Sequence, residues 1–118
     1  MTPAPLARAA VVAAALAFAA PAAAGFLTGA QWLKLSAEEQ AAYVAGVYDA
    51  LVTYSTTTVE AEASAHYQTC AARARLTPES MAAGLKGDLG DDAKLLAEPA
   101  PGAFLNYIIK LCGKPQVR

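Results

Sequence analysis

The amino-acid sequence predicts an all-α protein, a small bundle of four or five short helices with one disulfide, after a cleaved signal peptide. Three observations lead to this prediction. Apolar residues recur at helical spacing behind helix-capping motifs, and no segment alternates apolar and polar residues as a half-buried strand would. The alanine-rich residues 1–24 form a separate segment, and the only two cysteines lie in residues 25–118.

Residues 1–24 have the pattern of a secretory signal peptide. Arg8 is the only charged residue among them, and the uninterrupted apolar run 9–20 follows it. Ala22 and Ala24 fit the small-residue positions of a cleavage site, so we expect cleavage after Ala24 and a periplasmic protein. The alternative is a membrane anchor. A helix over the apolar run would rise only about 18 Å, whereas the hydrocarbon core is about 30 Å thick, so we expect no stable membrane span.

The composition of residues 25–118 excludes several classes of protein. This part holds all ten acidic residues and all basic residues except Arg8, so its charge is nearly balanced. A nucleic-acid-binding domain would show a basic excess, and a disordered acidic tail would be less apolar and more highly charged. A chain of this length can bury one small core. We therefore predict a single helical domain over residues 25–118.

Two capping boxes predict the first two helices. Thr28 and Gln31 have the spacing of one such motif and predict a short helix over residues 29–35, with Trp32 facing inward. The sequence Ser36-Ala37-Glu38-Glu39 is the second motif, and it begins the segment with the strongest helical periodicity in the chain.

The second helix carries a wide apolar stripe over about 18 residues. Tyr43, Val47, Leu51 and Tyr54 follow the spacing i, i+4, i+8, i+11, so we expect all four to face the core. Gly46 is an unusual residue inside a helix. Because several alanines surround it, we expect another helix to approach closely at this point.

The second half of the chain predicts two further helices. Thr77-Pro78-Glu79 is a typical helix start, with threonine at the N-cap and proline at the first helical position. Met81 and Leu85 would lie on its inner face. Pro101 would stand in the first turn of a last, amphipathic helix. The apolar residues of that helix have the spacing i, i+3, i+4, i+7 and are Phe104, Tyr107, Ile108 and Leu111.

The sequence does not decide the structure of residues 53–69. The β-branched and hydroxyl residues from Thr53 to Val59 are compatible with a frayed helix end, a loop or a short extended segment. A helix that resumes at Glu60 is consistent with the residues that follow.

Cys70 and Cys112 are the only cysteines. In an oxidising compartment two cysteines are expected to pair, and only one intrachain pairing exists. A disulfide here would stabilise the fold by roughly 4 kcal/mol on the chain-entropy estimate. The alternatives are an intermolecular bridge, free thiols and a metal site. A zinc site would need a fourth ligand besides the two cysteines and His66, the sole histidine.

No residue pattern predicts catalysis or a cofactor. Ser55 and Ser80 have no nucleophile-elbow motif or neighbouring base, and no glycine-rich phosphate loop is present. We therefore predict a protein that is not an enzyme and holds no cofactor or metal. Arg73 and Arg75 form the only local basic pair. They are interpreted either as a solvated stretch between helices or as an exposed loop that binds a carboxylate of a protein partner.

Several motifs occur in an order that resembles a known family. Gly29-x-x-Trp32-Leu33 is followed by Tyr43-Val44-Ala45-Gly46-Val47-Tyr48-Asp49-Ala50-Leu51. Cys70 then precedes Leu76-Thr77-Pro78, and the last amphipathic helix ends in Leu111-Cys112. This layout, over most of residues 26–112, resembles the Rap/Tai-type immunity proteins, small periplasmic helical proteins that neutralise amidase effectors of type VI secretion.

The resemblance implies a protein that binds without catalysis, often as a homodimer, with a loop that occludes the cleft of a secreted peptidoglycan amidase. It also implies that Cys70 and Cys112 form the structural bridge. It assigns no contact residues. Two other functions stay open on the sequence alone: an HdeA-like periplasmic acid-responsive chaperone, and an envelope binding module with another ligand.

Overall fold

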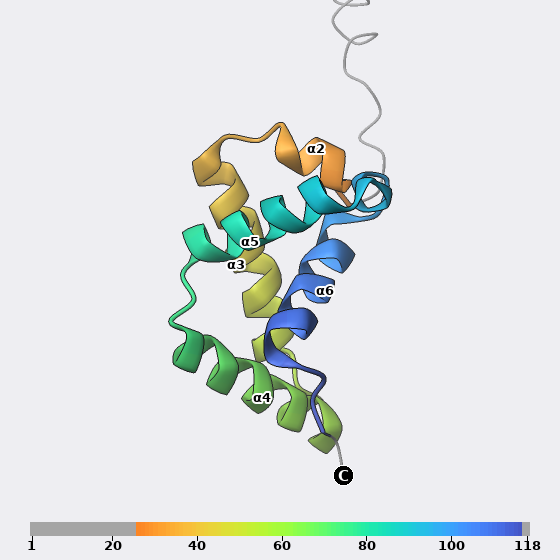
Figure 1. The fold of residues 1–118 in the computed structure, drawn as a ribbon. Coiled ribbons are helices and arrows are strands. Elements are labelled where there is room, and N and C mark those ends of the chain that lie inside the picture. Colours follow the sequence, from red (N-terminus) through yellow and green to blue (C-terminus); the bar gives the residue numbers. More distant parts are fainter. Residues whose placement is uncertain (1–25, 117–118) are drawn as a thin grey trace, which may run out of the picture.

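The computed structural model describes residues 26–116, so the predicted signal peptide, residues 1–24, lies outside the described residues. Five α-helices and one 3₁₀ helix make up the described chain (Figure 1), which confirms the predicted all-α fold. An isolated bridge between Thr28 and Pro99 is the only β-type pairing within residues 26–116. In chain order the elements are α2 (Gly29–Leu33), α3 (Ala37–Thr53), α4 (Thr58–Ala74), α5 (Pro78–Asp91), η1 (Ala93–Leu96) and α6 (Ala100–Cys112).

Reciprocal capping boxes begin α2 and α3, as predicted. At α2 the Thr28 N–H donates to Gln31 Oε1 at 2.9 Å, and the Gln31 N–H donates to Thr28 Oγ1 at 3.2 Å. Ser36 and Glu39 form the same pair of bonds at α3, with the same two distances. Each box satisfies N–H groups that a helix cannot pair internally. α2 ends at Leu33, two residues before its predicted end.

The helix starts in the second half of the chain are also where the sequence predicts them. Thr77 caps α5 and Pro78 occupies the first turn of that helix, while Pro101 lies in the first turn of α6. None of the helices within residues 26–116 has the length and apolar character needed to cross a membrane.

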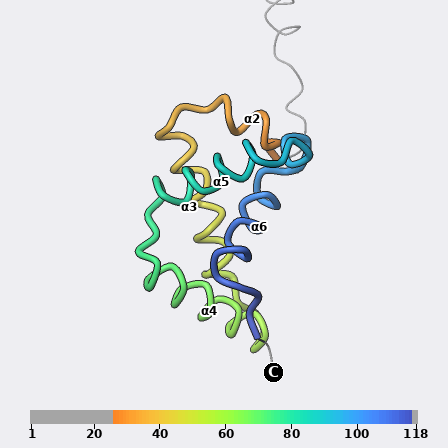
Figure 2. The backbone as a smooth tube through the Cα atoms, viewed as in Figure 1, coloured from red at the N-terminus to blue at the C-terminus, as the bar shows by residue number. Residues whose placement is uncertain are grey.

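The apolar core lies where α3, α5 and α6 meet. α3 and α5 share the most extensive helix–helix interface, and α6 runs down beside them in Figures 1 and 2. Full burial of an aliphatic or aromatic side chain stabilises the folded state by about 1.5–3 kcal/mol. The fully buried side chains where the three helices meet therefore supply most of the apolar stabilisation. The fully buried large side chains are Trp32, Val44, Leu85, Leu89, Phe104 and Ile108.

Backbone hydrogen bonds join the segment before α2 to the segment before α6. The Gly29 N–H donates to the Glu98 carbonyl at 2.9 Å, and the Ala100 N–H donates to the Leu27 carbonyl at 2.7 Å. Residues near the beginning of the described chain therefore lie beside residues that are about 70 positions later. This pairing closes the end of the bundle where α2 and η1 lie.

The predicted apolar stripe of α3 is wrong at its C-terminal end. Tyr43, Val47 and Leu51 are partly buried and pack against the core, but Tyr54 is 70% exposed. The reason is that α3 ends at Thr53, so Tyr54 leaves the helix with an extended backbone. Leu111 is likewise 45% exposed, because it lies in the last turn of α6, beyond the core.

The predicted close approach at Gly46 is also wrong. A Cβ atom added at Gly46 would meet no other atom within 4 Å, whereas one added at Gly84 of α5 would overlap the ring of Tyr107 of α6. Gly84 is therefore the glycine that lets α5 and α6 come close. Lys110 and Asp88 join the same two helices at their surface, with Nζ 3.0 Å from Oδ2.

Candidate partner-binding site

The candidate site comprises α4, the turn 54–57 that precedes it and the end of α6 that is attached to it. In Figure 1, α4 lies across the lower end of the molecule, away from α2 and η1. It is a weakly apolar helix, and its only buried residues are Ser64, Tyr67 and Cys70. α4 is consequently held in place by polar bonds and a covalent bridge more than by an apolar face.

Hydrogen bonds attach α4 to the C-terminal half of α3. The Tyr48 hydroxyl donates to the Tyr67 carbonyl at 3.5 Å, and the Ser64 hydroxyl donates to the Val52 carbonyl. Gln68 Nε2 donates to the same Val52 carbonyl at 3.3 Å and to Ser64 Oγ at 3.0 Å. Burial raises the pKa of both tyrosine hydroxyls, with the nearby Asp49 carboxylate adding to the effect at Tyr48.

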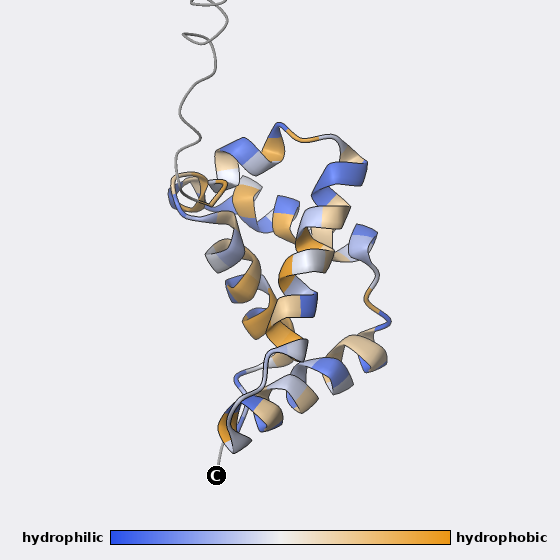
Figure 3. Cartoon of the chain, turned by 180° about the vertical axis from the view of Figure 1, so that it is seen from behind, coloured by the Kyte–Doolittle hydropathy of each residue, from blue (hydrophilic) through white to orange (hydrophobic). Residues whose placement is uncertain are grey.

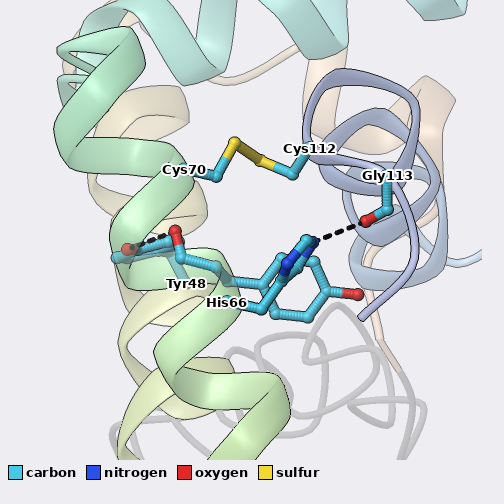
Figure 4. Close-up of a disulfide and its surroundings, with 6 residues drawn as sticks. Tyr48, His66, Cys70, Cys112 and Gly113 are labelled. Atoms are coloured by element: carbon cyan, nitrogen blue, oxygen red, sulfur yellow. Dashed lines mark hydrogen bonds between the residues drawn. A yellow bond between two sulfur atoms is a disulfide. The ribbon is translucent and has the colours of Figure 1, made fainter. Parts of the chain in front are cut away.

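The Cys70–Cys112 disulfide attaches α4 to the last residue of α6, which confirms the intrachain bridge (Figure 4). The two Cα atoms are 5.6 Å apart, within the usual range for a disulfide. One turn earlier on α4, His66 Nε2 donates to the Gly113 carbonyl at 2.9 Å. The His66 ring also packs edge-on against Tyr67, with 5.2 Å between ring centroids. The bridge and the hydrogen bond together fix the end of α6 on α4.

These contacts bear on the metal site that the sequence leaves open. Cys70 and Cys112 are bonded to each other, and His66 directs Nε2 at a carbonyl oxygen. Within residues 26–116, no group of three or more His, Cys, Asp or Glu side chains is placed to hold a metal ion. The Cys70–Cys112 disulfide and the hydrogen bond of His66 to Gly113 therefore have a structural role.

The two arginines lie at the C-terminal end of α4, and the prediction that both belong to a loop is wrong for Arg73. Arg73 is in the last turn of the helix, and Arg75 is its C-cap residue with a left-handed backbone, φ 52° and ψ 45°. Both side chains are exposed. A cation is favoured at this end because the last carbonyls of a helix carry partial negative charge. A partner-binding role for Arg73 and Arg75 stays a prediction.

At the opposite end of α4, the Glu60 carboxylate organises the turn 54–57. Glu60 Oε2 accepts hydrogen bonds from Thr56 N at 2.6 Å, Thr56 Oγ1 at 2.7 Å and Thr57 N at 3.0 Å. The Glu60 N–H donates back to Thr57 Oγ1 at 3.2 Å, which completes a capping box. These bonds, those from Thr56 first, lower the pKa of the Glu60 carboxyl. The turn is therefore ordered by side-chain bonds of its own.

Two exposed apolar side chains lie at this end of the site, Tyr54 in the turn and Val59 in the first turn of α4. Tyr54 is 70% exposed and Val59 is 52% exposed. No motif in the sequence predicts a role in binding for either residue. A signal for the turn is nonetheless present, because Thr57-Thr58-Val59-Glu60 has the spacing of a capping box. A helix start at Thr58 places Tyr54 in a turn outside the helices.

No protein-family model, curated protein or solved structure matches this chain. The resemblance to the Rap/Tai-type immunity proteins therefore stays a prediction. The function of this protein is proposed below from the residues of α4 and the turn 54–57.

Proposed function

We propose that this protein is an exported, non-catalytic binding protein and acts as an immunity protein that blocks a peptidoglycan amidase toxin. The turn 54–57 is the observation that carries the proposal. It contains Tyr54, 70% exposed, and Thr56 and Thr57, which Glu60 fixes through three hydrogen bonds. An ordered turn loses little conformational entropy on binding, and tyrosine is one of the residues that contribute most to the free energy of binding at interfaces.

The rest of α4 supports the same proposal. The disulfide and the His66–Gly113 bond fix the C-terminal half of the helix to the end of α6. Arg73 and Arg75 add two exposed guanidinium groups, which can form paired hydrogen bonds with a carboxylate of the partner. An exposed tyrosine before α4 and a basic C-terminal end of α4 suit a protein that covers the cleft of another protein.

The proposal is tested with a peptidoglycan amidase encoded beside the gene of this protein. We expect the two purified proteins to bind each other and the amidase to lose activity on peptidoglycan. Tyr54→Ala should weaken the affinity by about tenfold or more, as truncation of a central aromatic contact does. Phe26→Ala is the matched control, because Phe26 is an aromatic residue of similar exposure, 74%, in the segment before α2.

Two results would contradict the proposal. One is the absence of binding at micromolar concentration. The other is an equal loss of affinity for Tyr54→Ala and Phe26→Ala, because the turn would then have no special part in the complex.

An acid-responsive chaperone is the second candidate, and the attachment of α4 is the observation that favours it. Protonation of Glu60 would remove the charge that strengthens three hydrogen bonds at the start of α4. Few apolar side chains of α4 are buried, so in acid the helix would depend on the disulfide and on its hydrogen bonds to α3. Suppression of the aggregation of an unfolded client protein near pH 3 would support this function. Unchanged aggregation would rule it out.

A further inference from the structure

A groove of about 310 Å³ lies between the C-terminal end of α5, η1 and the outer side of α6. We refer to it as the α5–α6 groove. It is a different surface from the α4 site, because none of its lining residues belongs to α4 or to the turn before it. No step in the proposed immunity function uses this groove.

The floor of the α5–α6 groove is apolar. Leu95 of η1 and Ile109 of α6 line it and are only partly buried. Leu105 lies one turn before Ile109, on the same side of α6, and is 36% exposed. α6 therefore has apolar side chains both toward the core and toward this groove, and Figure 3 shows apolar colour over most of its length. Leu105 thus adds an exposed apolar side chain on α6 beside the groove, whose lining also includes the polar Asn106.

The rim of the groove is acidic. Asp88, Asp91 and Asp92 line it, against a single ammonium group, that of Lys110. Lys110 pairs with Asp88 at 3.0 Å, so the carboxylates of Asp91 and Asp92 give the groove a negative charge. Both are exposed at the C-terminal end of α5, whose last turn contains no basic residue.

Negative charge is unfavourable at this position for the helix itself. The last carbonyl groups of a helix carry partial negative charge, and a cation is the group that stabilises them. Asp92 has one local partner, since its Oδ1 accepts the Lys94 N–H at 3.0 Å and begins η1. A positively charged group beside Asp91 and Asp92 would therefore be electrostatically favourable.

We propose that the α5–α6 groove binds a basic amphipathic helix of a protein partner. Its lysine or arginine head groups would pair with Asp91 and Asp92, and its apolar face would cover Leu95, Ile109 and Leu105. Long basic side chains suit this arrangement, because their aliphatic stems cover apolar surface while the charged ends stay at the rim. Docking of an amphipathic helix along an apolar groove is a common mode of recognition.

The test uses a synthetic peptide of leucine and lysine at helical spacing and a matched peptide with glutamate in place of lysine. Affinity is measured by calorimetry, and the bound surface is mapped by amide chemical shifts. We expect the lysine peptide to bind and to shift the amides of Leu95 and Ile109, with weaker binding at high salt. The glutamate peptide should not bind.

Variants identify the groups responsible. Asp91→Asn with Asp92→Asn should lower the affinity for the lysine peptide by about tenfold. The matched control is Glu38→Gln with Asp49→Asn, which removes the same charge from exposed positions of α3 and should change affinity by less than about twofold. Leu105→Gln should also weaken binding without loss of folding, because Leu105 is already exposed.

Three results would overturn the proposal. They are equal effects of the two charge variants, shifts that map away from the α5–α6 groove, and self-association that the Asp91/Asp92 variant abolishes. The last result would assign the groove to a second copy of this chain.

Discussion

Two regions of this molecule are held together by different interactions. The group formed by α2, α3, α5 and α6 meets around fully buried apolar side chains such as Trp32 and Phe104. α4 is attached by a disulfide, by hydrogen bonds to Val52 and Gly113 and by few buried apolar atoms. In Figure 3 the hydropathy colours follow this difference, with more polar colour along α4 than along α6.

The comparison shows that two regions of one small domain can respond to different changes in side chains and in solution conditions. Apolar burial depends on the shape of the side chains and is unaffected by reductants. A helix attached by a covalent bridge and polar bonds responds to reduction and to pH, because those conditions change the bonds themselves. We therefore expect substitutions in the core to unfold the whole domain, and substitutions around α4 to loosen α4 first.

The largest effect is expected from Phe104→Ala. Phe104 is fully buried at the centre of the core, and truncation of such a residue costs about 3–5 kcal/mol because it leaves a cavity. The free energy of unfolding, from urea titration followed by circular dichroism, should fall by this amount. Leu105→Ala is the control, since the neighbouring side chain is 36% exposed. Equal losses for the two variants would show that the core has been assigned to the wrong face of α6.

Cys112→Ser is expected to destabilise the protein by roughly 2–4 kcal/mol, the usual cost of losing a native disulfide. The loss should not be uniform. Amide hydrogen exchange should become fast in α4, while the amides of α5 near Leu85 keep most of their protection. Treatment of the oxidised protein with a dithiol should reproduce both effects. Identical unfolding midpoints for oxidised and reduced protein would contradict the assignment of α4 to a separately attached region.

Gly84→Ala is expected to destabilise the protein by about 1–3 kcal/mol, because the added methyl group overlaps the ring of Tyr107 and separates α5 from α6. Gly87→Ala is a matched control three residues later on the same helix, where a Cβ meets nothing within 4 Å. That control should stabilise the helix by up to about 1 kcal/mol. Thermal melts of the two variants should shift in opposite directions, and shifts of the same sign would count against a close α5–α6 contact at Gly84.

The smallest effect is expected from Glu60→Gln, and only above acid pH. The folded-state pKa of Glu60 is lowered by its bonds to Thr56 and Thr57. The carboxylate therefore stabilises the folded state fully above the ordinary glutamate pKa of about 4.3, and this contribution is lost as pH falls through the lower folded-state pKa. The protection of amides at the start of α4, taken relative to the intrinsic exchange rate at each pH, should depend on pH between about 5 and 3 in the wild type, and much less in the variant. An equal dependence in both proteins would exclude Glu60 as the group that orders the turn.

Local signals in the sequence predict most of the helix starts. The pairs Thr28–Gln31 and Ser36–Glu39 and the sequence Thr77-Pro78 act within one turn of chain, so their effect does not depend on the rest of the fold. The pairing of Cys70 with Cys112 is predictable for another reason, since two cysteines allow a single intrachain bridge.

Features that depend on packing are predicted less well. The periodicity that assigns Tyr54 to a buried stripe continues past Thr53, but helical spacing does not reveal where a helix ends. Gly46 and Gly84 look alike in the sequence, and only the position of Tyr107 on another helix distinguishes them. The α5–α6 groove combines residues from three elements, so no local pattern indicates it.

The backbone bonds between residues 27–29 and 98–100 have a consequence for the order in which the fold can close. The segment before α2 has its hydrogen-bond partners at Glu98 and Ala100, about 70 residues later. Cys70 can form its disulfide only after Cys112 has been added to the chain. A chain that emerges from the ribosome with its N-terminus first contains neither partner until residues 98–112 have emerged. Both closures join residues far apart in sequence, which is the slow type of contact in folding. The domain therefore stays open during its own emergence and closes at both ends when the last helix arrives.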